Sequence, residues 1–338
     1  MKAEQEYISI FSQNKNLIDE HSSEVINGLR DIAFQDFKRL GFPASNDEDY
    51  SYTDMQKLFM PDYGLNLKRY NFKAEQKDLF HCSLPNLSTY AYFVVNDSFY
   101  GRTSATSSLP ENVYAGSLKS FTEKYPEIAA KYYGKSASTS TDGMVALNTM
   151  FAQDGFVLYV PQGVSIDKPI QLINVFRSEF DFMANRRILI IIEAQASAKL
   201  LVCDHSMGTS NFLSNEVIEI FAEENAFFDI YDLEESNLST SRFSSVHVEQ
   251  AAGSNVLVNG ITLNNGITRN NYRINLNGPY AESTLCGMSI LDKNQQADVF
   301  SNIAHNAPDC QSNELFKNVL DGHSRGAFRG RIFVKEGA

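Results

Sequence analysis

A repeat in the second half of the chain limits its possible folds more than any other feature. Short polar turns precede apolar-rich strands in the segments "DKPIQLINV", "SAKLLVCDH", "NAFFDIYDL", "SNVLVNGIT", "ESTLCGMSI" and "RGAFRGRIF". The equivalent positions are taken as Pro169, Lys199, Phe227, Asn255 and Thr284. The steps between them are 30, 28, 28 and 29 residues. The next step, to Ala327, is 43 residues, which indicates either an insertion or one and a half periods.

A nearly constant step with degenerate side chains is expected when each period forms one coil of a β-solenoid, because the coils above and below bury its apolar face. At about 4.8 Å per coil, roughly six coils would form a stack about 30 Å long with strand edges at its two ends. A β-sandwich with irregular hairpins is the alternative. Asn-Gly pairs placed to join adjacent strands, which favour hairpins, are nearly absent, with Asn265-Gly266 as the exception. The sequence therefore predicts a mainly β fold with a solenoid core.

Individual segments of this half show the alternation of half-buried strands. In "NNYRINLNG", apolar Tyr272, Ile274 and Leu276 alternate with polar residues, and Val246 and Val248 do the same in their segment. A period of two places alternate side chains on opposite faces of a strand. We therefore expect strands and no long helix after about residue 150.

The first part of the chain has a mixed character, and we expect an N-terminal helical α+β domain over residues 1–140, followed by a β-helix core over residues 141–338. Apolar residues over 22–40 follow helical spacing and predict one helix that ends at Gly41. "TYAYFVVND" predicts a strand. The Ser/Thr run "SASTSTDG" marks the boundary between the two domains.

Residues 117–133 predict two short helices, the second opened by Pro126 and closed by Gly134. Gly134, Lys135 and Ser136 also match the end of a phosphate-binding loop. The first glycine of that motif would stand at position 129, where the chain has Ala, and the segment closes a helix instead of opening one. We therefore expect a glycine cap followed by a flexible linker.

Charge and hydropathy exclude several classes of protein. The chain has 29 Lys plus Arg against 41 Asp plus Glu, a net charge of -12, which disfavours a nucleic-acid surface. The longest aliphatic run, residues 188–192, is far shorter than a bilayer span, and the N-terminus has no apolar signal region. We therefore expect a cytoplasmic protein with no membrane contact. The cysteines lie far apart without a C-x-x-C pair, and we expect free thiols at Cys82, Cys203, Cys286 and Cys310.

Histidines and cysteines give the candidate metal ligands. His305, Cys310 and His323 form the one sequence cluster with three potential ligands, but their spacing matches no zinc motif, and packing with turn hydrogen bonds is the default interpretation. Cys203 and His205 are two residues apart and would share one face of a strand. Two ligands do not close a site, so we expect Cys203 to pack and His205 to mark the strand exit.

Other residues with chemical potential are few. Arg186-Arg187, just before the aliphatic run, could form a local anion patch, although a solvated turn is the favoured interpretation. Nucleophile elbows, paired carboxylates and a Ser-His-Asp order are not recognised in the sequence. We expect no catalytic residue.

Three segments resemble the SufB/SufD family of iron–sulfur cluster assembly scaffolds, and its SufD branch most closely. They are "ALNTMFAQDGFVLYVPQGVSIDKPIQL" (146–172), "HNAPDCQSNELFKNVLDGHSRGAFRGRI" (305–332) and "NDEDYSYTD". In the third segment the family usually has Trp where this chain has Tyr50. His305 and Cys310 match the family pattern H-x-A-P-x-C, from which no ligand role is carried over.

The resemblance implies a right-handed parallel β-helix between helical N-terminal and C-terminal domains. It implies a non-catalytic scaffold that pairs with a SufB-like β-helix subunit and a SufC-like ATPase, or with itself when SufB is absent. No intrinsic cofactor is expected, but a transient iron–sulfur cluster could form at the interface. The family's Cys-x-His segment and SufC-binding helices lie beyond residue 338, so we expect a C-terminal helical domain to be missing from this sequence and the natural chain to continue. The alternatives are a SufB-like cluster-bearing paralogue and a β-helix carbohydrate-active enzyme.

Overall fold

The computed structural model describes residues 3–44, 47–70, 88–102 and 109–338, and Cys82 lies outside these ranges. Most helices come first in the chain. They are α1 (Ala3–Glu20), α2 (Glu24–Asn27), α3 (Arg30–Leu40), the 3-10 turn η1 (Glu48–Tyr50), α4 (Met55–Phe59), α6 (Leu118–Lys124), α7 (Pro126–Tyr132) and α8 (Gly143–Phe151). Among the helices described, none is both long enough and apolar enough to cross a membrane.

The strands form two sheets, each with eight strands in the described part of the chain. The odd sheet contains β1 (Tyr90–Val95), β2 (Ser98–Arg102), β5 (Ile170–Arg177), β7 (Ser197–Met207), β9 (Phe227–Glu235), β11 (Asn255–Asn264), β13 (Glu282–Leu291) and β15 (Gln311–Leu320). The even sheet contains β3 (Tyr114–Ser117), β4 (Phe156–Val160), β6 (Phe182–Ile192), β8 (Phe212–Ala222), β10 (Thr240–Gln250), β12 (Ile267–Leu276), β14 (Gln296–His305) and β16 (Arg325–Val334).

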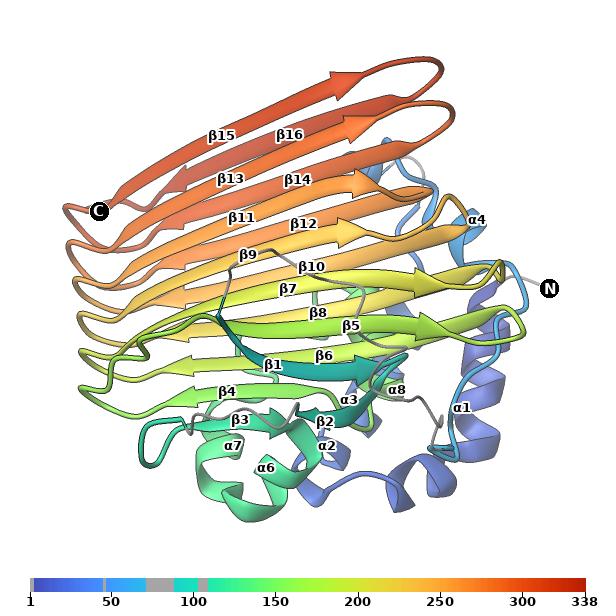
Figure 1. Cartoon of the computed structure of the whole chain (residues 1–338), viewed down its shortest axis with the longest axis horizontal. Coiled ribbons are helices and arrows are strands. Elements are labelled where there is room, and N and C mark those ends of the chain that lie inside the picture. Colours follow the sequence, from blue (N-terminus) through green and yellow to red (C-terminus); the bar gives the residue numbers. More distant parts are fainter. Residues whose placement is uncertain (1–2, 45–46, 71–87, 103–108) are drawn as a thin grey trace.

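From β4 onward the chain winds as a solenoid. Consecutive strands alternate between the two sheets, and each strand pairs in parallel with the strand two positions later. The coils β5–β6 to β15–β16 are stacked one on another in Figure 1, six of them within the described residues. This topology confirms the predicted solenoid and excludes the β-sandwich, whose strands would pair through antiparallel hairpins. The right-handed sense stays an expectation of the resemblance.

The observed register refines the predicted repeat. Lys199 pairs with Asp229, two residues beyond Phe227, and Thr284 pairs with Leu257. A shift of two residues keeps each side chain on the same face, so the pattern of the repeat survives the error. Ala327 pairs with Asp298 in the even sheet, whereas the other marked positions lie in the odd sheet. The long last step is therefore one and a half periods, and the insertion interpretation was wrong.

The predicted helices are confirmed in part. Residues 22–40 form two helices instead of one, because the chain turns at Gly28 and Leu29 between α2 and α3. Gly41 ends α3 with a φ of 64°, in the left-handed region that glycine favours. Pro126 opens α7 and Gly134 follows it with a φ of 71°, as predicted. Helix α8, which begins where the Ser/Thr run ends, was not predicted.

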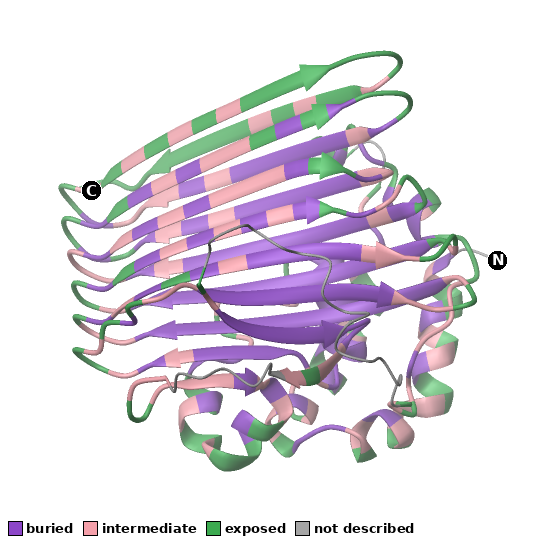
Figure 2. Cartoon of the chain, viewed as in Figure 1, coloured by how far each residue is buried: buried purple, intermediate pink, exposed green. Residues whose placement is uncertain are grey.

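Helices cover the outer face of the even sheet. The Asn148 amide of α8 donates hydrogen bonds to the carbonyl oxygens of Arg186 (2.9 Å) and Asn215 (2.8 Å), which joins the helix to β6 and β8. Aromatic residues of α1 and α3, such as Phe11 and Phe37, belong to the same apolar cluster as residues of β6, β8 and β10. Burial is greatest in the first coils and falls toward β15 and β16 (Figure 2). The early part of the even sheet is therefore buried on both of its faces.

Candidate functional site

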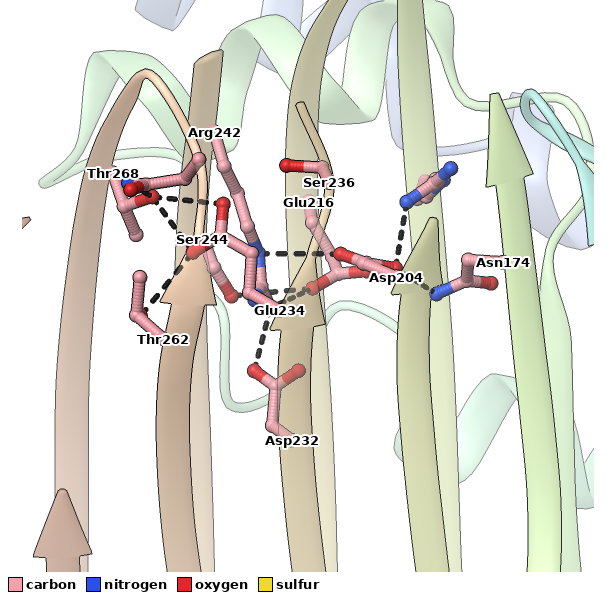
Figure 3. A network of polar contacts seen from close by, with 12 residues as sticks. Asn174, Asp204, Glu216, Asp232, Glu234, Ser236, Arg242, Ser244, Thr262 and Thr268 are labelled. Atoms are coloured by element: carbon pink, nitrogen blue, oxygen red, sulfur yellow. Dashed lines mark hydrogen bonds and ion pairs between the residues drawn. The ribbon is translucent and has the colours of Figure 1, made fainter. Parts of the chain in front are cut away.

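The lumen between the two sheets is apolar along one lateral side of the solenoid and charged along the other. In β6, Arg186 is followed inward by Ile188 and Ile190, and the inward residues of β8 are Glu216 and then Ile218. The even strands begin on the lateral side of the solenoid where the odd strands finish. The polar residues that start the even strands therefore meet the polar residues that end the odd strands (Figure 3). We call the resulting group of ionisable side chains the lumen cluster: Arg186, Asp204, Glu216, Asp232, Glu234 and Arg242.

Arg242 of β10 is the centre of this cluster. Its Nη2 donates to Glu216 Oε1 at 2.8 Å and to Asp232 Oδ2 at 2.5 Å, while its Nε lies 3.6 Å from Asp204 Oδ2. One guanidinium thus contacts carboxylates from three strands, β7, β8 and β9. Its five N–H donors in a fixed fork suit this role better than an ammonium group would.

Arg186 is the second cation of the cluster. Its Nη1 donates to Asp204 Oδ1 at 2.9 Å, and its Nε donates to the carbonyl oxygen of Asn96 at 2.8 Å. The guanidinium also lies 4.2 Å from the centre of the Phe176 ring. Asp204 accepts a further hydrogen bond from the Asn174 amide at 2.7 Å. Asp204 is therefore paired with both arginines and with a neutral donor.

Glu234 is bound differently, because its hydrogen-bond donors are hydroxyl groups. The Thr268 hydroxyl lies 2.8 Å from Oε1 and 2.7 Å from Oε2, and the Thr262 hydroxyl lies 3.2 Å from Oε2. Two acceptors elsewhere in the cluster, Glu216 Oε2 and Asp232 Oδ1, have no hydrogen-bond partner among the described residues. The four carboxyl groups and two guanidinium groups of the lumen cluster are therefore unequally matched in charge.

The environment shifts the acidity of these carboxyl groups in different directions. Burial raises the pKa of Glu216 to about 7, although Arg242 opposes it. Burial also raises the pKa of Glu234 to about 7 and raises that of Asp232. For Asp204 the two arginines outweigh burial and lower the pKa. The cluster therefore contains one carboxylate that is held ionised and others that burial drives toward the neutral form.

On the outer face of the even sheet, Glu219 of β8 forms a second buried charge site. Its Oε2 accepts from Arg187 Nη2 at 2.6 Å and from the Gly134 amide at 2.9 Å. Its Oε1 accepts from the amides of Ser136 and Ala137, each at 3.1 Å. The Gly-Lys-Ser segment thus does surround an anion with backbone amides, but the anion is a carboxylate of the same chain. It does not behave as the flexible linker that we expected.

His247 of β10 also lies on the outer face of the even sheet, in the layer that the helices cover. Its Nε2 is 2.8 Å from the Ser245 hydroxyl, and the ring is buried. Burial, together with the positive charges of Arg273 and Arg187, lowers the pKa of this histidine to about 3. The imidazole is therefore neutral at physiological pH and acts as a hydrogen-bonding part of the sheet surface.

The structure separates the three residues of the predicted ligand cluster. His305 ends β14 and Cys310 lies in the next turn, on one lateral side of the solenoid. The His305 Nε2 is 2.8 Å from the Ser312 hydroxyl, and Cys310 Sγ lies 3.3 Å from the carbonyl oxygen of Gly278. His323 follows β15 and so lies on the opposite lateral side (Figure 1). Across the described residues, three or more His, Cys, Asp or Glu side chains are nowhere grouped so that they could hold a metal ion. His305 and Cys310 stay a candidate pair, and His323 is separate from them.

The other predicted positions are buried strand residues. Cys203 and His205 share the outer face of β7, as expected, and both are buried, but the strand continues beyond them to Met207. Arg186 and Arg187 lie within β6 and are buried on its two opposite faces, so the solvated turn and the anion patch were both wrong. Among the described residues, Cys203, Cys286 and Cys310 are thiols that form no disulfide bond.

Sequence reasoning missed the lumen cluster and Glu219. The signal was present, because charged residues stand at inward positions of otherwise apolar strands: Glu216 precedes Ile218 and Ile220, and Asp232 follows Ile230. A charge that keeps the period of two on the apolar face of a predicted strand indicates a buried polar network.

Two protein-family models match adjacent parts of the chain. The description "SufBD protein N-terminal region" matches residues 1–172. The description "SUF system FeS cluster assembly, SufBD core domain" matches residues 175–338. The boundary between the matched regions falls within β5, after helix α8.

Several named proteins are similar to this chain at low identity over most of its length. The iron-sulfur cluster assembly SufBD family protein slr0076 of Synechocystis is 23% identical over 313 residues, which cover 88% of this chain and 67% of the relative. The chloroplastic protein ABCI7 of Arabidopsis thaliana is 22% identical over 328 residues, covering 93% and 66%. The iron-sulfur cluster assembly protein SufB of Bacillus subtilis is 24% identical over 210 residues, covering 61% and 44%. The chain thus spans about two thirds of the length of the first two relatives and less than half of the length of the third. Because the two family models together match nearly the whole chain, the chain belongs to the SufBD family of the SUF iron–sulfur cluster assembly system.

Proposed function

We propose that this chain is a non-catalytic, SufD-like scaffold subunit of the SUF machinery. It would pair with a SufB-like β-helix subunit and a SufC-like ATPase to build and transfer iron–sulfur clusters. The observation that carries this proposal is the match of the two SufBD descriptions to nearly the whole chain, over a fold that is a stack of parallel coils. We place this activity in the cytoplasm.

A scaffold role is supported by the location of the charged groups. The carboxyl groups and guanidinium groups of the lumen cluster are buried between the sheets, where a substrate in solution does not contact them. The backbone amides of Gly134, Ser136 and Ala137, in the segment that resembled a phosphate-binding loop, donate to Glu219. These features support a division of labour in which a separate subunit hydrolyses ATP.

Contacts with other subunits are supported by the outer face of the odd sheet. Large apolar side chains that point away from the lumen are exposed along β13 and β15: Met288, Ile290, Leu315 and Val319. Contiguous exposed apolar side chains are typical of protein interfaces. A β-helical partner could contact this surface, and a second copy of the chain could do so when SufB is absent.

The iron–sulfur cluster is cargo in this proposal and no resident cofactor is assigned. His305 and Cys310 are the first residues to test as contacts for iron or sulfur, since they lie on the same lateral side of the solenoid and Cys310 is only half-buried. His323 is tested separately because strand β15 separates it from them. Exchange of these residues for Ala or Ser would lower cluster yield in the assembled complex if they contact the cargo.

Genetic complementation tests the SufD assignment against the SufB-like alternative. The full-length product of the gene is expressed in bacteria that lack either sufD or sufB and are grown under iron limitation. We expect growth to be restored in the sufD mutant only, and we expect co-purification with the SufB and SufC proteins of the source organism. Rescue of the sufB mutant alone, or strong cluster absorbance from the isolated reconstituted chain, would instead assign the SufB-like role.

A further inference from the structure

We propose that the charged side of the solenoid lumen is a proton-binding site, in which Glu216 and Glu234 each hold one proton taken up from solvent. The bound species is the neutral carboxylic acid, formed when one carboxylate oxygen accepts a proton. This inference rests on the fold and the lumen cluster, and it does not depend on the proposed function.

The first support is the balance of charge. Asp204, Glu216, Asp232 and Glu234 would carry four negative charges if all were ionised, against two positive charges on Arg186 and Arg242. All six side chains are at least nine-tenths buried. A buried, uncompensated charge costs several kcal/mol, and carboxyl groups in such sites usually bind a proton instead. Two protons would bring the cluster to neutrality.

The second support is the pattern of donors, which shows where the protons would reside. Arg186 and Arg242 both lie near Asp204, and Arg242 donates its shortest hydrogen bond to Asp232. Glu234, in contrast, is bound by the hydroxyl groups of Thr262 and Thr268, which can donate to an ionised carboxyl group or accept from a neutral one.

Glu216 can also hold a proton, because one of its two carboxyl oxygen atoms has no hydrogen-bond partner in the described part of the chain. Its Oε1 is occupied by Arg242 and by the Ser244 hydroxyl at 3.3 Å, whereas its Oε2 is buried without a hydrogen-bond partner in the described part of the chain. The free oxygen atom is therefore available to carry the proton. The pKa values of about 7 for Glu216 and Glu234 agree with this geometry.

The groups that face the two glutamates come from every strand around them. They are Arg186 from β6, Asp204 from β7, Asp232 from β9, Arg242 from β10, and the phenol of Tyr272 from β12. Tyr272 is buried, and burial raises its pKa well above the ordinary value, so it adds no charge near neutrality. The arginines keep their charge throughout this range. Burial also raises the pKa of Asp232, but Asp232 accepts the shortest hydrogen bond of Arg242, so we assign the two protons to the glutamates.

Proton counting on unfolding tests the proposal directly. The folded protein and the protein unfolded in urea are titrated potentiometrically, and the difference gives the protons released on unfolding. With folded pKa values of about 7 and ordinary unfolded values near 4.5, each glutamate would release about one proton at about pH 6. We expect Glu216→Gln and Glu234→Gln each to lower the count by about one, and the double variant to lower it by about two.

Glu235→Gln is the matched control, since it makes the same change one residue away on the exposed outer face of β9, and it should leave the count unchanged. If a glutamine variant fails to fold, Thr268→Val serves in its place, because loss of the hydroxyl that stabilises ionised Glu234 should move proton release to higher pH. An infrared band of protonated carboxylic acid in the folded protein at about pH 6, reduced by about half in Glu234→Gln, would confirm the site. Equal proton counts for the wild type and both glutamine variants, or no carboxylic acid band, would overturn the proposal.

Discussion

Removal of the Arg187 charge should destabilise the sheet more than any surface change. Arg187 and Glu219 are both fully buried, and their charged atoms are 2.6 Å apart. Burial opposes the charge of the guanidinium, yet Glu219 outweighs it and raises the pKa of Arg187. Arg187→Met keeps much of the side-chain volume but leaves the carboxylate without a counter-ion. Loss of one partner from a buried pair costs about 3–5 kcal/mol, which sets the expected decrease in the free energy of unfolding.

Urea unfolding measures the global effect, and hydrogen exchange measures the local one. The amides of Gly134, Ser136 and Ala137 donate to Glu219, so these amides should exchange faster in Arg187→Met. Lys199→Met is the control: Lys199 is exposed and its partner Asp229 is partly exposed, and surface pairs of this kind contribute about 0–1 kcal/mol.

A double-mutant cycle isolates the charge from other losses. Arg187 also donates to the side chains of Asn148 and Thr149, and these bonds are lost in every variant that removes the guanidinium. Arg187→Met and Glu219→Gln each leave one uncompensated charge, whereas the double variant leaves none. The double variant should therefore lose less than the sum of the single losses, by about 2 kcal/mol. A loss below about 1 kcal/mol for Arg187→Met, with unchanged exchange of the three amides, would refute the claim that Arg187 neutralises a buried carboxylate.

Two further perturbations test the covered layer and the core. Because burial lowers the pKa of His247 from 6.5 to about 3, its contribution to stability is complete above pH 6.5 and is lost as the pH falls toward 3. Unfolding of the wild type and of His247→Gln at a series of pH values should therefore give a difference that changes in this window, and a constant difference would contradict it. Ile218→Ala, on the apolar side of the lumen, should lower the free energy of unfolding in urea by about 2–5 kcal/mol. Val319→Ala, on an exposed surface, should cost less than about 0.5 kcal/mol, and equal losses would show that the lumen is not tightly packed.

The periodic features of the fold were predictable from the sequence because they depend on local alternation. Strand β12 was recognisable from Tyr272, Ile274 and Leu276, all of which face the lumen. The spacing of the coils was recognisable because each coil must repeat the apolar face of the one below. The phase was less certain: Lys199 and Phe227 are offset by two residues, since an alternating pattern matches itself after any even shift.

Contacts across the outer face of the even sheet were not predictable from any one segment. Whether Arg187 meets solvent or a helix layer depends on α8 and the loop before it, which come from a different part of the chain. The same is true of Glu219, whose partners are backbone amides and leave no side-chain pattern in the sequence. Paired charges on sequentially distant strands, such as Asp204 and Arg242, likewise become neighbours only through the stacking of the coils.

The buried charges of β6 explain how this strand can have a unique register. Its residues 188–192 are aliphatic at both inward and outward positions, so the hydrophobic pattern alone would tolerate a slip of one residue. Arg186 and Arg187 are consecutive and therefore point to opposite faces of the strand. Arg186 pairs with Asp204 in the lumen, and Arg187 pairs with Glu219 on the outer side. A slip of one residue would move one arginine into the place of the other, so that one carboxylate keeps an arginine while the other loses its partner. The slip would therefore leave one buried carboxylate and one buried guanidinium group unpaired, at a cost of several kcal/mol. Ion pairs that contribute little net stability can thus select one of two registers that the apolar residues cannot distinguish.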